Sequence, residues 1–327
     1  MERRDALTFG LAFIAAGAQI FGRALGQSPY PERPVKLIIP FAPGGLTDLV
    51  GRPWADKMKA LLGTVFVEHQ PGAGGTIGAA AVTRAAPDGY TLLLGSASQF
   101  LIPAAARGQY DPIKDFAPIS ILVGAALVVA VHPAVPASSL QQLIDYAKAH
   151  PGKLSYGSGG IGSTGHLAGE LLKSLAGTPD IVHVPYKGAG QMITDLISGQ
   201  VPMLVINFSG QVRDLHQAGK LRMLAVTTPN RIKIAPEVPT AAEAGLPGWV
   251  FENFTGLFAP AGTPKPIVDQ IAQATRTAMA DDEFRQTLIA LGFEPYLASG
   301  PDMARRFIEE QVGRWAPVVK SLGLKAE

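Results

Sequence analysis

The chain has no cysteine and little charge, and each shortage excludes a class of function. Without cysteine there is no disulfide, thiolate metal site, thiol nucleophile or acylated lipoprotein cysteine. Only 17% of the 327 residues are charged, and the formal net charge of +2 is spread along the chain without basic runs. The electrostatic footprint of a nucleic-acid-binding protein is therefore missing. Apolar residues nevertheless make up 47%, so we expect the chain to fold, and its length of 327 residues predicts about two domains.

The first 26 residues have the pattern of an export signal. Arg3 and Arg4 precede an uncharged stretch over residues 6–22, and residues 24–26 (Ala-Leu-Gly) are small enough for a signal peptidase site. The stretch is short for a membrane span of about 20 residues, which makes a retained anchor the weaker interpretation. We therefore predict cleavage near Gly26 and a periplasmic mature protein. The paired arginines match a twin-Arg signal only in part, so the export route stays open.

Short β-branched runs alternate with helical patterns along the rest of the chain. This alternation predicts an α/β fold of mainly parallel sheets with helices on both faces. Residues 119–132 form a long apolar stretch interrupted at Gly124, and residues 221–227 form a second long strand. We interpret both as strands that cross between two lobes, forming a two-strand hinge. The first lobe is then discontinuous, with residues 27–124 and 228–327, and residues 125–227 form the second lobe.

Four glycine-rich turns lie between a predicted strand and a predicted helix, at residues 43–48, 71–78, 157–165 and 187–190. Such turns lie at the carboxyl ends of strands, where open α/β sheets bind ligands. Each exposes backbone N–H groups at the positive end of a helix dipole. One such turn alone could merely permit tight geometry. Together they predict a cleft that holds a carboxylate without Lys or Arg beside it.

The candidate ligand-binding residues come from these turns and from neighbouring strand ends. Thr47 and Asp48 could instead only cap their helix. His166 could line the cleft from a first helical turn, while Tyr186 and Phe208 could either wall the ligand or pack between lobes. The complete predicted set is Gly44, Gly45, Leu46, Thr47, Asp48, Ser96, Ser98, Gly160, Ser163, Thr164, His166, Tyr186, Asn207 and Phe208.

A hydrolase or a nucleotide-dependent oxidoreductase could use the same cleft. Residues 157–162 satisfy the GxGxxG pattern after a predicted strand, but the next strand runs into residues 185–187 (PYK) rather than an acidic residue for a ribose. The six histidines lack the spacing typical of a metal site. No nucleophile has an activating base at a recognisable spacing. The sequence therefore favours a binding receptor that is not an enzyme and has neither metal nor cofactor.

Several motifs occur in a fixed order along the chain. They are YP at 30–31 leading to PFAPGG at 40–45 with Asp48, PGAGG at 71–75, PDGYTL at 87–92, YGS at 156–158, HLAGE at 166–170, VPYKG at 184–188, GKLR at 219–222, the prolines at 236 and 239, and APAGTP at 259–264. Over residues 28–324 these motifs resemble the Bug-type periplasmic solute-binding receptors of tripartite tricarboxylate transporters.

That resemblance implies a type II periplasmic-binding-protein fold that closes over a small organic acid. It implies that backbone amides and ordered water hold the carboxylate, from the loop after Phe41 and the loop after Gly157. It also implies a monomer that delivers its ligand to the membrane subunits of a tripartite transporter.

One strand departs from the family pattern. The family usually has V-D-x-x-x-D-N, whereas here Val201 is followed by Pro202, Ile206 stands at the position of the second acid, and Asn207 is retained. The cleft floor is therefore predicted to be less acidic than in many relatives. This disfavours an amino-acid ligand, whose ammonium needs a partner, and favours simple carboxylates, including aromatic ones.

Overall fold

The computed structural model describes residues 30–106 and 109–324. The chain divides into two units, residues 1–32 and residues 33–327, and the second unit carries the fold and the site. The predicted export signal lies outside the described residues, and its cleavage stays a prediction. Within the described part, no helix has the length and apolar character needed to cross a bilayer.

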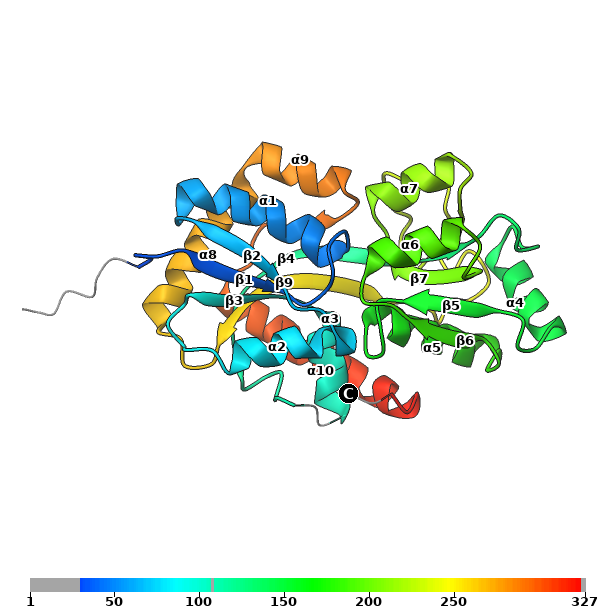
Figure 1. The fold of residues 1–327 in the computed structure, drawn as a ribbon, viewed down its shortest axis with the longest axis horizontal. Helices are drawn as coiled ribbons and strands as arrows, with labels where there is room; N and C mark the ends of the chain where they lie inside the picture. Colours follow the sequence, from blue (N-terminus) through cyan, green and yellow to red (C-terminus); the bar gives the residue numbers. More distant parts are fainter. Residues whose placement is uncertain (1–29, 107–108, 325–327) are drawn as a thin grey trace, which may run out of the picture. The chain divides into compact units, whose positions relative to one another are not determined.

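The first lobe is built on a sheet with the order β2-β1-β3-β9-β4 (Figure 1). β1 pairs in parallel with β2 and β3, whereas β9 runs antiparallel to both β3 and β4, and β10 pairs antiparallel with β4. The strands are β1 (Val35–Ile39), β2 (Val65–His69), β3 (Thr91–Ser96), β4 (Phe116–Val131), β9 (Glu252–Pro260) and β10 (Glu294–Pro295).

Helices bury the apolar faces of this sheet. Trp54 of α1 is fully buried and donates its Nε1–H to Thr275 Oγ1 of α8 at 3.3 Å. On α3, the ring of Phe100 lies 4.3 Å, centroid to centroid, from Phe258 of β9. The elements of this layer are α1 (Leu46–Leu61), η1 (Ala73–Gly75), α2 (Thr76–Thr83), α3 (Ala97–Ala106), α8 (Lys265–Ala280), α9 (Asp282–Ala290) and α10 (Pro301–Ser321).

The second lobe continues from β4 in the order β4-β7-β5-β6, with β8 also paired to β4. Side chains alternate between the two faces of its strands. One face packs on α6 and α7, and the other packs on α4 and α5. The elements are α4 (Leu140–Ala149), β5 (Ser155–Ser158), α5 (Thr164–Ala176), β6 (Val182–Pro185), α6 (Ala189–Ile197), β7 (Met203–Asn207), α7 (Gly210–Gln217) and β8 (Arg222–Val226).

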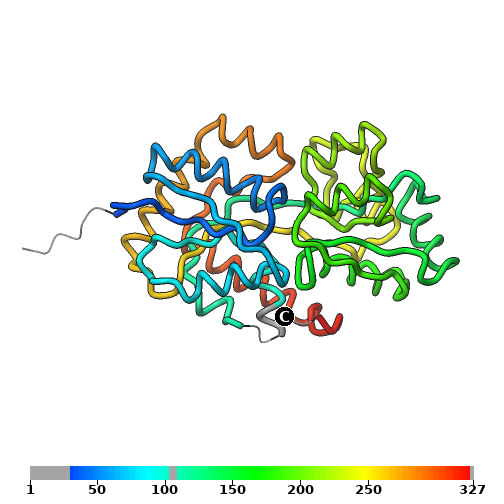
Figure 2. Tube along the Cα trace, in the orientation of Figure 1, coloured from blue at the N-terminus to red at the C-terminus, as the bar shows by residue number. Residues whose placement is uncertain are grey.

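Both lobes share the strand β4, which is the first predicted crossing. Its residues 116–126 pair with β9, and residues 127–131 pair with β7 and β8. The crossing is confirmed, although the change of partner follows Ala126 rather than Gly124. Figure 2 shows the chain passing between the lobes along β4 and again along the yellow segment that leads into β9.

The predicted second crossing at residues 221–227 needs correction. That segment is β8, which pairs with residues 128–131 of β4 in the second lobe. The chain returns through β9, which begins at Glu252. The intervening segment contains Pro229, Pro236, Pro239 and Pro247, which lack the N–H groups that one long continuous strand would need.

The two-lobed α/β fold is confirmed, but its sheets are mixed rather than mainly parallel. Parallel pairs occur at β1 with β2 and β3, and at β5 with β6 and β7. The pairs made by β4 and β9 are antiparallel because one carries the chain out of the first lobe and the other brings it back. The residue boundaries assigned above to the lobes remain a prediction.

Candidate ligand-binding site

A cleft lies where the carboxyl ends of β1, β3, β5, β6 and β7 meet, which is where open α/β sheets bind ligands. It encloses about 680 Å³, including the space at its mouth. The lining residues are Phe41, Gly44, Gly45, Leu46, Thr47, Leu49, Ser96, Gly159, Ser163, Thr164, Gly165, Gly188, Ala189, Met192, Ile193, Val205, Ile206, Asn207, Phe208, Ser209 and Asn253.

Four helices begin at this cleft. The lining includes the first residues or N-caps of α1, α5, α6 and α7. Backbone N–H groups in a first helical turn have no acceptor within the helix, and the helix dipole places partial positive charge there. The cleft therefore offers backbone donors from both lobes to an anion.

These helix starts are of two kinds. Ser163 Oγ accepts from the His166 N–H at the start of α5, and Ser209 Oγ accepts from the Val212 N–H at the start of α7. By contrast, α1 and α6 begin after Gly45 and Gly188, and in the described structure no side chain caps either start. All first-turn donors of α1 and α6 therefore remain available to a ligand, whereas α5 and α7 each have one donor taken up by the cap.

The uncapped starts of α1 and α6 come from different lobes and lie side by side. Ala42 N donates to Lys187 O at 3.2 Å, which joins the loops that precede the two helices. A Cβ added at Gly45 would lie 3.8 Å from the Cβ of Ala189, and one added at Gly188 would lie only 2.8 Å from the Cβ of Ala42. One carboxylate can therefore reach N–H groups of both lobes.

A side-chain amide network forms the floor of the cleft beside these helix starts. Asn253 Nδ2 donates to Asn207 Oδ1 at 2.8 Å and to Thr164 Oγ1 at 3.3 Å. Asn253 Oδ1 accepts from the backbone N–H groups of Ala97 and Phe254. Because Asn207 uses its oxygen as the acceptor, its Nδ2 group remains a donor that can face a ligand.

The lining of the cleft contains no ionisable side chain in the described structure. Asp48, which was predicted to contact ligand, lies behind the α1 turn. Its Oδ2 accepts from Gly44 N at 2.9 Å, and its Oδ1 accepts from Arg52 Nε at 2.8 Å and lies 2.7 Å from His69 Nε2. The carboxylate therefore holds the turn in shape, which is the capping alternative recognised from the sequence.

Three further predicted residues also lie outside the lining. Ser98 is buried, and its Oγ is 3.0 Å from Ser96 Oγ. Gly160 has a φ of +114°, and a Cβ there would lie 3.0 Å from Tyr186 O. Tyr186 donates its hydroxyl to Asp195 Oδ2 at 3.0 Å, and burial together with that contact raises the pKa of Tyr186 to about 12.

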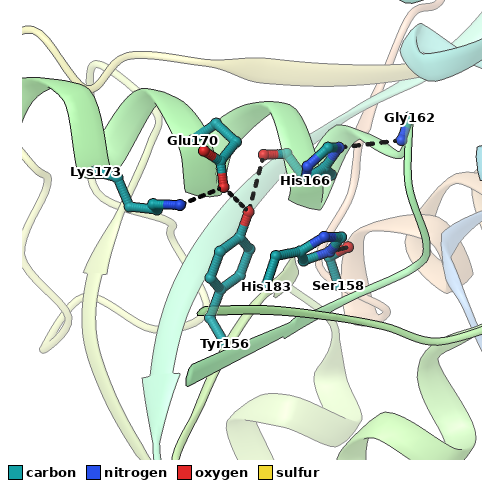
Figure 3. Close-up of polar contacts among 7 residues, drawn as sticks. All are labelled: Tyr156, Ser158, Gly162, His166, Glu170, Lys173 and His183. Atoms are coloured by element: carbon teal, nitrogen blue, oxygen red, sulfur yellow. Dashed lines mark hydrogen bonds and ion pairs between the residues drawn. The ribbon is translucent and has the colours of Figure 1, made fainter. Parts of the chain in front are cut away.

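His166 shapes the loop at residues 159–163 from behind (Figure 3). Its Nδ1 accepts from Gly162 N at 3.1 Å, and its ring stacks on His183 with 4.1 Å between centroids. Burial lowers the pKa of His166, and burial together with the adjacent His166 ring lowers the pKa of His183 to about 4. Both rings are therefore neutral near pH 7. The bond from Gly162 requires this of His166, because a protonated Nδ1 could not accept it.

Ser158 and His183 form the only pair in Figure 3 with the composition of a nucleophile and its base. Ser158 Oγ lies 2.7 Å from His183 Nε2. However, Ser158 is fully buried and outside the cleft lining. The neighbouring Glu170 accepts from Tyr156 OH at 2.8 Å and pairs with Lys173 at 3.0 Å, so it does not orient His183. This cluster offers no accessible nucleophile.

In the described ranges, no three His, Asp or Glu side chains gather as a metal site would require.

The structure thus brings together most of the predicted residues: Gly44, Gly45, Leu46, Thr47, Ser96, Ser163, Thr164, Asn207 and Phe208. Sequence reasoning missed Gly188 and Ala189, although their turn was recognised as glycine-rich. It also missed Met192 and Ile193, which follow the pattern of ordinary core positions on an amphipathic helix. Asn253 had no local signal, because its role depends on contacts with residues far away in the sequence.

Comparison with known proteins identifies the family. The family model described as the tripartite tricarboxylate transporter family receptor matches residues 50–324. This chain belongs to that receptor family. The solved structure of the periplasmic binding protein BugD has a TM-score of 0.86 and 34% identity, and the match covers 91% of this chain and 100% of BugD. The Bug-type resemblance is therefore confirmed.

Two related receptor structures contain dicarboxylates. MatC from Rhodopseudomonas palustris, solved with malate, has a TM-score of 0.84 and 33% identity over 89% of this chain and 100% of MatC. R. palustris Rpa4515, solved with adipate, has a TM-score of 0.84 and 33% identity over 90% of this chain and 99% of that protein.

Proposed function

We propose that this chain is a periplasmic receptor that captures a small organic acid between its lobes and delivers it to the membrane subunits of a tripartite transporter. The observation that carries the proposal is the meeting of the uncapped α1 and α6 starts, one from each lobe, in one cleft. Backbone donors at helix N-termini are suited to carboxylates. The malate and adipate in related receptors support the same ligand class.

The proposed receptor has no catalytic step, and it acts as a monomer without a cofactor. A hydrolase would need an accessible nucleophile with a base, whereas Ser158 and His183 lie behind the loop. An oxidoreductase would need a nucleotide site, and the glycine-rich loop at residues 157–162 instead packs against the opposite lobe at Gly74. The loop thus contacts the opposite lobe through residues 161 and 162.

The decisive experiment is recovery of the natural ligand. The mature protein is purified gently and denatured, and the released small molecules are identified by mass spectrometry. Calorimetric titration of the stripped protein with the recovered acid should then give one site per chain and no new product. Recovery of a nucleotide, or conversion of the acid, would overturn the proposal.

Sequencing the N-terminus of periplasmic material tests cleavage near Gly26.

Ligand binding is proposed to close the lobes about β4 and β9, so that the lobe built on β1, β2 and β3 moves against the lobe built on β5, β6 and β7. Small-angle scattering of stripped protein should show a smaller radius of gyration after the recovered acid is added. Tight binding with an unchanged radius of gyration would contradict closure while leaving carboxylate recognition intact.

A further inference from the structure

We infer that the ligand is a monocarboxylate with an apolar aliphatic or aromatic body, rather than a dicarboxylate or an amino acid. This inference rests on the proposed receptor function. It concerns what occupies the part of the cleft beyond the carboxylate, and it separates this chain from the relatives solved with malate and adipate.

Apolar side chains form the walls beyond the helix starts. Leu46 and Leu49 come from α1, Met192 and Ile193 come from α6, and Ile206 lies on β7. The last three belong to one buried cluster of the second lobe. The wall is therefore continuous with the hydrophobic core and is formed before ligand arrives, so it favours a body that needs no hydrogen bonds.

Most polar side-chain atoms of the lining already have partners inside the protein. The hydroxyl of Ser96 donates to Gln99 Oε1, and that of Ser163 donates to Ser158 Oγ. Ser209 caps α7, and Asn253 uses both ends of its amide. Over residues 30–106 and 109–324, Thr47 Oγ1 and Asn207 Nδ2 are the lining side-chain groups for which no partner is found, and the hydroxyls of Thr164 and Ser209 accept a bond but donate none. These neutral donors and the helix starts suffice for one carboxylate, and the lining holds no Lys or Arg that could pair with a second.

Nearby cations are directed elsewhere. Lys187 is exposed and outside the lining, and its carbonyl oxygen joins the lobes at Ala42. Arg52 binds Asp48 and is 54% exposed. A second carboxylate buried against Leu49 or Met192 would therefore lose its hydration without gaining a partner.

The cleft lining also offers no charged partner for the ammonium group of an amino acid. Ile206, which stands where the family pattern has an acid, lies in the lining and is only 5% exposed. The departure seen in the sequence is thus located in the cleft itself. With no carboxylate in the lining, the ammonium of an amino acid would be buried unpaired.

The test compares matched acids that differ at the far end only. Hexanoate and adipate share a six-carbon chain, and benzoate and terephthalate share a ring. Each is titrated by calorimetry into the stripped mature protein. We expect hexanoate and benzoate to bind at least tenfold more tightly than their dicarboxylate counterparts. Equal or tighter binding of adipate or terephthalate overturns the inference while leaving the receptor function in place. Failure of all four acids, and of any acid recovered from the protein, overturns the receptor function itself.

A variant gives a second measurement. Leu49 is only half-buried and lines the cleft, so Leu49→Lys places a cation beside the apolar body with little disturbance of the core. We expect the preference for hexanoate over adipate to fall at least tenfold, while Leu49→Met keeps the wild-type ratio. An unchanged ratio in a folded Leu49→Lys protein would show that this wall does not face the ligand. If the variant does not fold, the wild-type comparison of matched acids still decides the matter.

Discussion

The two loops that border the cleft are held by side chains at equivalent positions but of opposite chemistry. In the first lobe, Asp48 is the third residue of α1 and accepts from the N–H of Gly44, just before the cap. In the second lobe, His166 is the third residue of α5 and accepts from the N–H of Gly162, again just before the cap. A carboxylate tied to Arg52 does in one lobe what a neutral imidazole stacked on His183 does in the other.

This difference shows that the position of an acceptor, and not its charge, is what the loop geometry demands. Each bond satisfies a backbone donor that the helix itself cannot satisfy. The two acceptors therefore affect stability in different ways. Removing the carboxylate leaves its charged partners unpaired, whereas protonating the imidazole occupies the nitrogen that accepts the hydrogen bond, so that bond is lost.

The largest effect is expected for Asp48→Ala. It leaves Gly44 N, Arg52 and His69 without their shared partner, and the Asp48 side chain is 8% exposed. We expect a loss of about 2 kcal/mol in the free energy of unfolding, because Arg52 is partly exposed and recovers some hydration. Urea unfolding measures this loss, and Asp48→Asn, which keeps the acceptor oxygen, is the control. Equal losses in both variants would mean that charge rather than position holds the turn.

The next effect concerns the point where loops of the two lobes touch. A Cβ at Gly74 would lie 2.5 Å from Gly162 C and Ile161 O, so Gly74→Ala should hold the lobes apart. We expect ligand affinity to fall at least tenfold, about 1.4 kcal/mol. Gly152→Ala is the matched control, because Gly152 also has a positive φ of +74° but open space around it. If titration shows wild-type affinity in a folded Gly74→Ala protein, this contact does not limit closure.

A smaller effect is expected for His166→Leu. Leucine fills the space but cannot accept from Gly162 N, so the loop that lines the cleft loses a bond of about 1 kcal/mol. Ligand affinity should fall roughly fivefold, in line with that loss. His166→Asn can present an oxygen near the same place and should restore most of the affinity. If calorimetry shows equal losses in both variants, the bond to Gly162 is not the reason for the histidine.

The histidine pair also predicts a dependence of stability on pH. Burial, followed by the adjacent His166 ring, lowers the pKa of His183 to about 4, while an unfolded histidine titrates near about 6.5. Between these values the unfolded chain binds the proton and the folded chain does not, so stability falls as pH drops from about 6.5 towards 4. We expect a loss of about 1 kcal/mol at pH 5 relative to pH 7, after allowing for partial exposure.

The control for this pH dependence is His183→Phe, which keeps a ring against His166 but does not titrate. Urea unfolding at the two pH values should show a smaller difference in the variant than in wild type. An identical difference in both proteins would assign the acid sensitivity to other groups.

The smallest effect is expected for Lys187→Met. Lys187 is exposed and contributes its backbone oxygen, rather than its side chain, to the contact between lobes. Titration with the recovered acid should show less than a twofold change in affinity, about 0.4 kcal/mol. Loss of binding would replace the backbone mechanism with a side-chain ion pair.

Much of the fold could be predicted because local patterns carried it. The β-branched run at residues 35–40 forms β1, and the segment between Asp281, a typical capping residue, and Gly292 forms α9. By contrast, α3 was missed because its polar start at residues 97–99 looks like a loop, and Pro103 lies inside it. The return through β9 was misplaced because β8 is equally strand-like by itself, and tertiary pairing decides which strand crosses.

The site residues likewise divide into those that a local sequence pattern indicates and those that it does not. Gly45 and Ser163 could be found because glycine-rich turns and cap residues are short-range signals. The contacts of Asn253 with Asn207 and Thr164 join residues far apart in the chain, which no local pattern reports. Whether Asp48 and His166 face the ligand or the back of their loop depends on side-chain direction, and that follows only from the packed structure.

The shared strand β4 has a consequence for how the molecule folds. One strand of 16 residues pairs with β9 and β10 in the first lobe and with β7 and β8 in the second, so unfolding of either sheet also removes backbone partners from the other. Its partner β9 lies more than a hundred residues later in the sequence, so the first lobe cannot be completed until the second lobe has been synthesised. We therefore expect the two lobes to fold and unfold as a single cooperative unit.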